Sequence, residues 1–382
     1  MSYDVIVIGL GAMGGATVHE LARRGLHVLG LEAFTPAHQL GSSGGRSRII
    51  RLAYFEHPDY VPLLQAAWDG WQEMERLSGE QLLIETGGLY AGRAGSDVLD
   101  GALESARSHG LPHELLDADA VGRRFPALRL DSDMAAVHEP LAGLLVPEAC
   151  IETQLRLAVD HGAELHFDER VTGWHGAADR LVVATVNETY EAGRLVVAAG
   201  AWLPRLLPEL APLLTVERNV LFWFEPAVTP ELLAPDRLPV YLVEMDDEHT
   251  YYGFPTLPGQ GAKVARHHGG RGAASVDPDR LDRQVHPADE QTVRDFCAHH
   301  LPAANGRLLE TRVCMYTNTP DDHFIIDFAP SDRRVVVASP CSGHGFKFSN
   351  VVGRICADLA ADGGTDFEIR FLSLDRFGQR RP

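Results

Sequence analysis

A short apolar strand that runs directly into a glycine-rich turn most constrains what this chain can fold into. Residues Asp4 to Ile8 form a β-branched run typical of a strand that is buried on both faces. The turn Gly9-Leu-Gly-Ala-Met-Gly14 follows at once, and the next residues, Ala16 to Arg24, are predicted to be helical, with Gly25 as the C-terminal cap. Leu26 to Leu31 is predicted to be a second strand. This order predicts a βαβ unit that binds a dinucleotide; the alternative is a glycine-rich turn in an ordinary βαβ unit.

The three glycines and an acidic residue have separate expected roles. Gly9 allows the tight turn, Gly11 lets the backbone approach a diphosphate, and Gly14 allows close helix–strand packing. The helix N-terminus that follows favours an anionic diphosphate. Glu32 closes the second strand 23 residues after Gly9, where an acceptor for a ribose hydroxyl is expected. A carboxylate there disfavours NADP, but the motif does not choose between FAD and NAD.

Composition and charge narrow the class of protein. A chain of 382 residues with 45% hydrophobic content has room for two domains. The net charge of −19 opposes a nucleic-acid partner or an anionic membrane surface. We expect no membrane span and no leader peptide before the first strand, hence a cytoplasmic protein. The five cysteines show no metal-binding spacing, so free thiols and no metal site are expected.

Further strands are predicted along the chain. Thr172 to Gly200 has a hairpin-like pattern that ends in an apolar run from Arg194, which is typical of a return strand of the nucleotide domain. Val171, after a strand-like segment from Glu164 to Asp168, is a candidate contact for an adenine. Leu82 to Arg93 and Val216 to Lys263 contain alternating apolar and polar residues, which predicts antiparallel strands with one exposed face.

Two kinds of strand therefore interleave, which predicts two discontinuous domains. The nucleotide-binding domain is expected to comprise residues 1–82, 144–212 and 315–370, and the substrate domain residues 83–143 and 213–314. Residues 371–382 are expected to form a C-terminal tail.

Five patches carry polar groups that are hard to explain by packing. They are Arg48-Ile-Ile-Arg51 with Glu56, Tyr251-Tyr252-Gly-Phe-Pro255, Lys263 with His267, Cys314-Met-Tyr316, and Ser342-Gly-His-Gly-Phe-Lys-Phe-Ser349. Taken singly, they also fit a solvated helical face, core aromatics, a surface lysine, a loop histidine and a buried structural thiol. Together and in this order, they resemble the monomeric sarcosine oxidase and N-methyl-L-tryptophan oxidase family of FAD-dependent amine oxidoreductases. The resemblance covers essentially the whole chain, and its most specific stretches are Cys314-Met-Tyr-Thr with His323-Phe-Ile-Ile-Asp327, and Ser342 to Ser349.

The resemblance implies an α/β fold with a glutathione-reductase-type, Rossmann-like FAD-binding domain and a mostly antiparallel substrate domain. It implies an oxidase that converts an N-methyl or cyclic secondary amino acid into an imine, with dioxygen reduced to hydrogen peroxide. FAD is expected to be covalently attached through its 8α carbon to Cys314, and the substrate carboxylate to meet Arg51 and Lys347. The expected partners are this small molecule and dioxygen, and the protein is expected to be a monomer.

The same resemblance assigns the remaining site residues. His267, Tyr316 and Tyr252 are expected to line the substrate pocket with Leu242. Lys263 is expected where dioxygen is reduced, because its positive charge stabilises the negative charge that develops there. The expected catalytic residues are thus Lys263, His267, Arg48 and Tyr316. The expected cofactor-binding residues are Gly9, Gly11, Ala12, Met13, Gly14, Glu32, Ser42, Ser47, Arg48, Val171, Gly200, Trp202, Cys314, Gly343, Gly345, Phe346 and Lys347.

Two positions depart from the family pattern. Gly44 replaces a histidine thought to help the flavin attach, and Arg46 replaces an acidic residue. Cys341 adds a second thiol beside the lysine segment but lacks the Cys-Met-Tyr-Thr pattern. The attachment and the choice of amino acid therefore stay open. So do two rival functions: an FAD-dependent amino-acid dehydrogenase with a non-oxygen acceptor, and a flavin protein that transfers one-carbon units or acts as a sensor.

Overall fold

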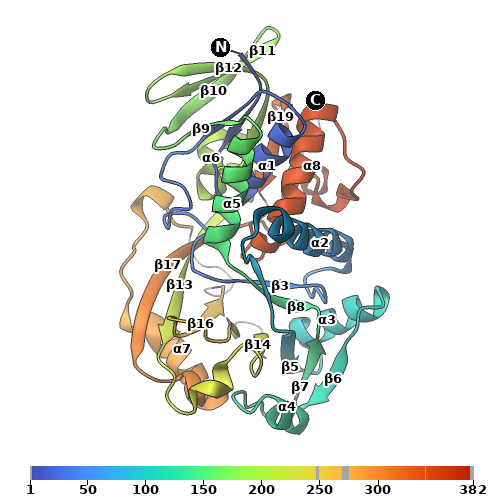
Figure 1. Cartoon of the computed structure of the whole chain (residues 1–382), viewed down its shortest axis with the longest axis vertical. Helices are drawn as coiled ribbons and strands as arrows, with labels where there is room; N and C mark the ends of the chain where they lie inside the picture. Colours follow the sequence, from blue (N-terminus) through green and yellow to red (C-terminus); the bar gives the residue numbers. More distant parts are fainter. Residues whose placement is uncertain (1, 247–248, 269–274, 340, 379–382) are drawn as a thin grey trace.

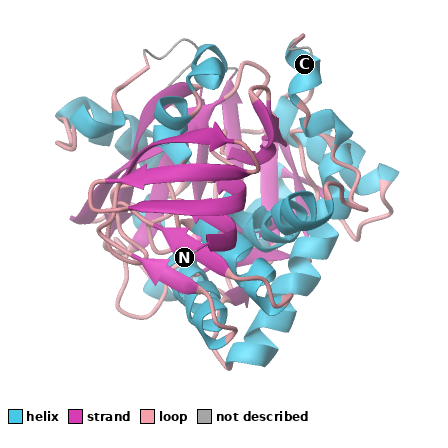
Figure 2. Ribbon diagram, turned by 90° about the horizontal axis from the view of Figure 1, so that it is seen from above, coloured by secondary structure: helices cyan, strands magenta, loops and turns pink. Residues whose placement is uncertain are grey.

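The structure, a computed structural model, describes residues 2–246, 249–268, 275–339 and 341–378. In Figure 1, these residues form an upper part that contains helices α1 and α8 and a lower part that is built on a second large sheet. Viewed from above, strands run through the middle of the molecule and helices lie around them (Figure 2).

The sheet of the upper part has eight strands. Its parallel strands lie side by side in the order β9, β2, β1, β12, β19. A hairpin of β10 and β11 extends the sheet from β12, and β18 pairs antiparallel with β19. The bounds are β1 Ser2–Ile8, β2 Val28–Leu31, β9 Glu164–His166, β10 Val171–Ala177, β11 Arg180–Thr185, β12 Thr189–Val197, β18 Ile325–Ala329 and β19 Asp332–Ser339.

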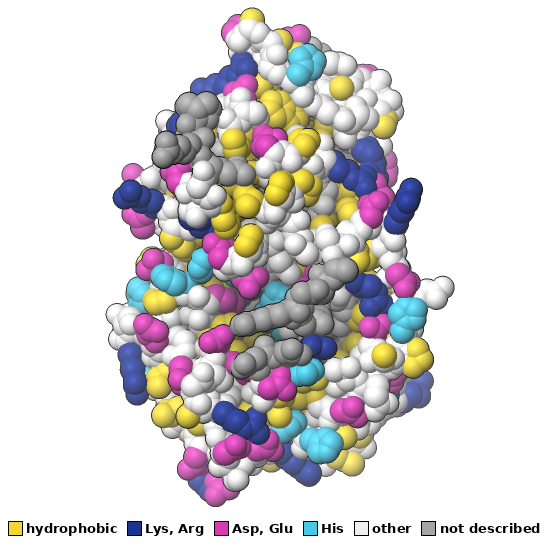
Figure 3. Space-filling model, turned by 180° about the vertical axis from the view of Figure 1, so that it is seen from behind, with side chains coloured by type: hydrophobic (Ala, Val, Ile, Leu, Met, Phe, Trp, Pro, Cys, Tyr) yellow, Lys and Arg dark blue, Asp and Glu magenta, His cyan; other side chains and the backbone are white. Residues whose placement is uncertain are grey.

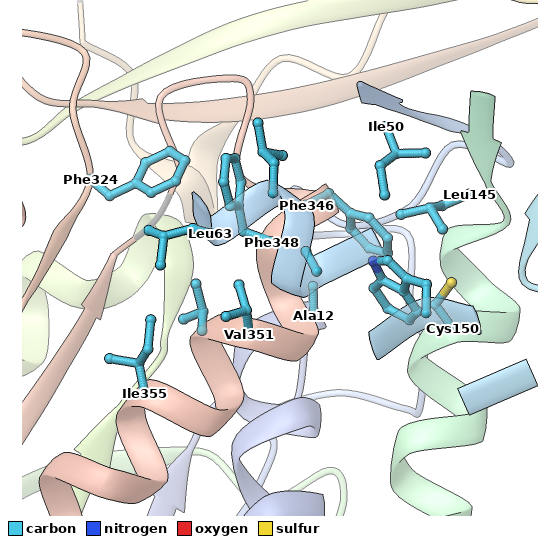
Figure 4. Close-up of a cluster of buried hydrophobic side chains, with 14 of the residues drawn as sticks. Ala12, Ile50, Leu63, Leu145, Cys150, Phe324, Phe346, Phe348, Val351 and Ile355 are labelled. Carbon is cyan, nitrogen blue, oxygen red and sulfur yellow. The ribbon is translucent and has the colours of Figure 1, made fainter. Parts of the chain in front are cut away.

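Strand β1 is buried on both faces, as its continuous apolar run predicts. Val5 and Val7 belong to the core beneath the helices, while Ile6 and Ile8 belong to the core on the opposite face, because side chains alternate along a strand. Val351 of α8 also lies in the helical core, which Figure 4 shows in part. The helices on that side are α1 Ala12–Arg23, α2 Val61–Ser78, α5 Pro147–Asp160 and α8 Ser349–Asp362; the short α6 Leu203–Leu206 contributes to the opposite core.

The sheet of the lower part also has eight strands, in the order β17, β13, β16, β15, β14, β5, β7, β6. Neighbouring strands are antiparallel except β14 and β5, so the prediction of a mostly antiparallel sheet is confirmed. The bounds are β5 Gly88–Arg93, β6 Glu114–Asp117, β7 Met134–Glu139, β13 Thr215–Phe224, β14 Val240–Asp246, β15 His249–Gly253, β16 Ala262–His267 and β17 Leu308–Asn318.

A small sheet lies between the two large ones. It contains β3 (Arg48–Arg51), β8 (Ala142–Leu145) and β4 (Leu83–Glu85), all paired antiparallel. Strand β3 carries Arg48 and Arg51 at its two ends. The remaining helices are α3 Asp97–Ser108, α4 Ala118–Arg124 and α7 Pro287–His300.

Some local predictions are wrong. Helix α1 begins at Ala12 rather than Ala16, because Gly14, a poor helix former, is needed there for close packing. The predicted strands Leu26–Leu31 and Glu164–Asp168 are shorter, beginning at Val28 and ending at His166.

The expected exposed face of the antiparallel strands is also absent from the middle of the sheet. All of β5 except Arg93 is buried, and the first five residues of β14 are buried. Their second face is covered by other elements, among them α3. The domain boundaries stay a prediction; the one between residues 314 and 315 falls inside the continuous strand β17.

The surface is mixed in charge. On the face shown in Figure 3, acidic and basic side chains are interspersed. Within the part of the chain that the structure describes, none of the helices combines the length and the apolar character that crossing a membrane requires.

Candidate active site

The turn between β1 and α1 requires glycine at two positions. Gly9 has a φ of +89°, and a Cβ there would lie 2.6 Å from the carbonyl oxygen of Ala198. A Cβ on Gly14 would lie 1.6 Å from the carbonyl oxygen of Gly9, so the first turn of α1 packs directly on the end of the strand. Only glycine tolerates this backbone and these contacts. The N-terminal end of α1 consequently lines a long pocket, where it favours an anionic group.

Glu32 is fixed at the end of β2 beside this turn. It is 6% exposed, and its carboxylate accepts hydrogen bonds from the N–H groups of Leu10 at 2.7 Å and Phe34 at 3.1 Å. His38 approaches it to 3.4 Å. Glu32 and Val171 both line the pocket, so the structure brings the predicted ribose acceptor and the predicted adenine contact into one pocket.

One pocket collects most of the predicted site residues. Those that line it are Gly9, Gly11, Ala12, Met13, Glu32, Ser42, Arg48, Arg51, Val171, Gly200, Trp202, Leu242, Tyr252, His267, Cys314, Tyr316, Gly343, Gly345, Phe346 and Lys347. Gly14, Ser47 and Lys263 lie outside its lining: Gly14 supports the turn, Ser47 is the last residue of the loop before β3, and Lys263 donates to that loop. The lining residues that sequence reasoning did not assign include Phe34, His38, Glu56, Glu169, Arg170, Cys341 and His344. The sequence carried a signal for Glu56, because this residue belongs to the same patch of polar groups as Arg48 and Arg51.

Cys314 lies on β17 at the wall of the pocket. Its side chain is 6% exposed, and its sulfur lies 3.8 Å from the carbonyl oxygen of Ser42. Cys341 lines the same pocket, but burial raises the pKa of its thiol to about 11. Because the thiolate is the nucleophile, Cys341 is the poorer candidate for a covalent bond at neutral pH.

Lys263 lies on β16 with its ammonium group fully enclosed. Its Nζ donates to the carbonyl oxygens of Gly45 and Ser47, both at 2.8 Å, and contacts the hydroxyl of Ser47 at 3.3 Å. The Phe254 ring lies 4.6 Å away, a favourable place for a cation. Burial, reinforced by Arg48, holds the pKa of Lys263 well below its usual range. The amino group of Lys263 is thus held out of solvent against the loop that contributes Ser42 and Ser43 to the pocket lining.

Arg51 and Lys347 line the same pocket as Glu32. Arg51 is 2% exposed, and its Nη2 donates to both oxygens of Glu56, at 2.6 and 2.7 Å. Lys347 donates from Nζ to the carbonyl oxygen of His344 at 2.6 Å. Burial, and then Arg51, lower the pKa of Lys347 to about 7. Two cations from distant parts of the chain therefore share one enclosed space, with an internal carboxylate bound to one of them.

The wall next to these cations is aromatic and neutral. His267 lies with its Nδ1 3.3 Å from the hydroxyl of Tyr316, and Tyr252 packs edge-on to the imidazole. Burial and the neighbouring cationic groups hold the pKa of His267 well below its usual range, so the imidazole is neutral at physiological pH. His344, to which sequence reasoning gave no chemistry, is buried and contacts the Tyr54 hydroxyl through Nδ1 at 2.5 Å.

Comparison with known proteins agrees with this arrangement. The model of a family described as FAD dependent oxidoreductase matches residues 4–359. The monomeric sarcosine oxidase of Streptomyces avermitilis is 45% identical over 367 residues, which cover 95% of each chain. The N-methyl-L-tryptophan oxidase of Yersinia pestis is 35% identical over 377 residues, which cover 99% of this chain and all of the relative. The solved structure of NikD, an unusual amino acid oxidase essential for nikkomycin biosynthesis, has a TM-score of 0.84 at 25% identity and covers 97% of each chain.

The fold with its two large sheets, the dinucleotide-binding turn in the pocket and the family match together identify a dinucleotide-dependent oxidoreductase. The chain belongs to the FAD dependent oxidoreductase family and, within it, to the family of the monomeric sarcosine oxidases and N-methyl-L-tryptophan oxidases. The residues present fit FAD. The turn at Gly9 and Gly14 leaves no room for a Cβ, as a diphosphate-binding turn requires, and the carboxylate of Glu32 lines the pocket where it can accept a hydrogen bond from a ribose hydroxyl. The predicted fold class, the enzyme class and the use of FAD are confirmed.

Proposed function

We propose that this enzyme oxidises the C–N bond of a secondary amino acid, N-methylated or cyclic, to an imine that water then hydrolyses. When bound, FAD accepts the two electrons and passes them to dioxygen, which leaves as hydrogen peroxide. The observation that carries the proposal is the burial of Arg51 and Lys347 in the pocket that also holds the dinucleotide-binding turn. The names of both relatives fit it, since each is an oxidase of an N-methyl amino acid.

Arg51 and Lys347 would hold the substrate by its carboxylate. A guanidinium can pair with a carboxylate through charge-assisted hydrogen bonds, and Glu56 already accepts two of them from Nη2 of Arg51. The protonated amino group of Lys347 has three N–H donors; one of them donates to the carbonyl oxygen of His344, and the others can donate to a substrate. A substrate carboxylate bound between them would fix the orientation of the amine, which is the main contribution of positioning to the rate.

His267 is the proposed hydrogen-bond acceptor for the substrate's neutral amine. An amine must be neutral to lose hydride equivalents from its neighbouring carbon, and nearby cations disfavour its protonated form. The neutral imidazole beside these cations can accept an N–H of the amine and orient it, while the Tyr316 hydroxyl orients the ring. Tyr252 and Leu242 would close the pocket around the substrate's side chain.

Cys314 is the proposed covalent tether of FAD, through a thioether to the 8α carbon. The bond would replace the S–H of the thiol and one C–H of the 8α methyl group, with dioxygen as the oxidant that takes up the two electrons and two protons released. Support comes from the place of Cys314 on the pocket wall and from the raised thiol pKa of its rival, Cys341. Cofactor contacts are proposed for the lining residues that were predicted from the sequence, among them Ser42, Arg48, Gly343 and Phe346.

Lys263 is the proposed site of dioxygen reduction. Its ammonium group lies behind the loop that lines the pocket, and a preorganised cation in a water-poor site stabilises developing negative charge strongly. We further propose that the enzyme is monomeric and, because the structure pairs none of its five cysteines in a disulfide, cytoplasmic.

A peroxide assay tests the proposed reaction. The purified enzyme is assayed with sarcosine, N-methyltryptophan, pipecolate and other N-alkyl amino acids. Each amino acid is compared, in a separate reaction, with the matched amine that lacks the carboxylate. We expect peroxide from one or more amino acids and at least about tenfold less from the matched amine, since the amine lacks the group that Arg51 and Lys347 bind. Flavin reduction without peroxide would favour the dehydrogenase alternative, and equal rates for both members of each pair would reject an amino-acid substrate.

A further inference from the structure

Glu148, in the first turn of α5, contacts the loop that precedes β3. One carboxylate oxygen accepts hydrogen bonds from the N–H groups of Gly45 at 2.9 Å and Arg46 at 3.1 Å, and from the side-chain amide of Gln39 at 3.1 Å. The side chain of Glu148 is only 24% exposed. A carboxylate that receives two backbone N–H groups from another part of the chain holds that backbone in place.

The opposite side of the same backbone contacts Lys263. The carbonyl oxygen of Gly45 and the N–H of Arg46 belong to one peptide group. That oxygen accepts from Nζ of Lys263 at 2.8 Å, while the N–H donates to Glu148. A single peptide group therefore bridges a carboxylate and an ammonium group, with the ends of its dipole aligned to both charges.

We propose that Glu148 is a positioning residue for the oxygen step: through the peptide group between Gly45 and Arg46, it places the ammonium group of Lys263 and keeps it charged. This proposal rests on the proposed role of Lys263. It assigns to Glu148 no contact with substrate or cofactor.

The charges that face Lys263 show why its ammonium group needs this support. Burial lowers its pKa most, and Arg48 and Arg312 lower it further, whereas Cys314 and Glu148 raise it. A thioether at Cys314 cannot form a thiolate, so Glu148 is the acidic group that remains among these neighbours. Although burial alone would raise the pKa of Glu148, the hydrogen bonds from Gly45 and Arg46 hold it below its usual range, so the carboxylate is ionised at neutral pH.

The outer side of Glu148 is also charged. Arg312 lies 3.7 Å from the carboxylate, and the side chain of Arg46 turns away from it to pair with Glu310 at 2.6 Å. Arg46 is, with Gly44, one of the two positions that depart from the family pattern. Its N–H, not its side chain, is the group that donates to Glu148, so its guanidinium does not interrupt the bridge to Lys263.

The test compares Glu148→Gln, which keeps the shape and a hydrogen-bond acceptor but removes the charge, with Glu152→Gln on the exposed side of the same helix. Stopped-flow measurements follow reoxidation by dioxygen and anaerobic reduction by substrate across pH 6 to 10. Reoxidation should fall as Lys263 loses its proton. In Glu148→Gln we expect this fall to move to lower pH by about one unit, because a neighbouring opposite charge is lost. Anaerobic reduction should stay within about twofold, and Glu152→Gln should match the parent enzyme in both steps.

Hydrogen exchange gives a readout that does not depend on activity. In Glu148→Ala, the amides of Gly45 and Arg46 lose their acceptor, so the peptide that contains residues 42–48 should exchange faster than in the parent or in Glu152→Ala. An unmoved reoxidation profile in Glu148→Gln, while Lys263→Met still slows that step, would overturn the proposal. Unchanged exchange in Glu148→Ala would overturn it as well. If Lys263→Met itself leaves reoxidation intact, the proposed role of Lys263 fails, and the exchange result alone decides whether Glu148 holds the loop.

Discussion

Arg51 and Glu56 form a bidentate ion pair inside the pocket, with Nη2 of the arginine 2.6 and 2.7 Å from the two carboxylate oxygens. The pair is almost fully enclosed, with side-chain exposures of 2% and 10%. A substrate carboxylate must share or displace Glu56 to reach Arg51. Under the proposed clamp, substrate affinity would therefore reflect the competition between two carboxylates for Arg51.

Lys347→Met should weaken binding of a carboxylate inhibitor by at least roughly tenfold, equivalent to about 1.4 kcal/mol. Removing one partner of a buried, charged hydrogen bond typically costs about 2–5 kcal/mol, and competition from Glu56 reduces the part that is observed. Titration of the flavin absorbance measures the dissociation constant. An amine without a carboxylate serves as the control and should bind equally to both proteins. Unchanged inhibitor binding in Lys347→Met and in an Arg51 variant would remove the clamp.

Affinity for the same inhibitor should fall as the pH rises from 6 to 9. The pKa of Lys347 in the free enzyme is about 7, lowered by burial and by Arg51, so the cation that attracts the carboxylate is lost above this pH. Binding of an anion stabilises the protonated lysine, so the complex should take up protons near pH 7. Dissociation constants at several pH values measure the trend, and calorimetry in two buffers measures the protons. The dependence should vanish in Lys347→Met; if it persists there, another group causes it.

Cys314→Ser should release the flavin on acid precipitation, whereas the flavin of the parent enzyme should stay in the protein pellet. Intact mass should show one FAD added to the parent and none to the variant. Cys341→Ser is the matched control, because it removes a thiol from the same pocket without touching the proposed tether. Loss of covalent flavin in Cys341→Ser but not in Cys314→Ser would reverse the assignment.

Lys263→Met should slow reoxidation of the flavin far more than its anaerobic reduction. The substitution keeps most of the buried stem but removes the charge proposed to stabilise negative charge on dioxygen. Stopped-flow measurements separate the two steps. Equal slowing of both would instead give Lys263 a structural role, because its Nζ holds the loop through Gly45 and Ser47.

Gly14→Ala should abolish FAD binding or folding, because its Cβ would lie 1.6 Å from the carbonyl oxygen of Gly9. Gly15→Ala is the matched control in the same helix. Its Cβ would meet its nearest neighbour, the side-chain oxygen of Gln154, at an ordinary 3.5 Å. The control should fold at least as well as the parent, since alanine is favoured over glycine in a helix by about 0.5–1 kcal/mol. Thermal melts and flavin content of the two variants provide the comparison.

Much of the nucleotide end could be predicted because its determinants are local. The turn from Gly9 to Gly14, the strand before it and Glu32 lie within a single βαβ unit, where spacing along the chain sets position in space. The predicted start of α1 is too late because helix propensity disfavours Gly14 and Gly15, while tertiary packing requires a glycine at position 14. Tertiary packing also explains why β5 lacks the exposed face that its sequence predicts, because elements far away in the sequence cover its second face.

The family, the cofactor and the residue types of the candidate active site follow from the sequence alone. How those residues are held became visible in the folded chain, where Arg51 donates to Glu56 and one peptide group links Lys263 to Glu148. Arg46 and Glu148 are 102 residues apart, and Gly45 and Lys263 are 218 apart. No local spacing encodes such pairs, because a buried charge takes whichever partners the packing of distant elements brings within hydrogen-bonding distance.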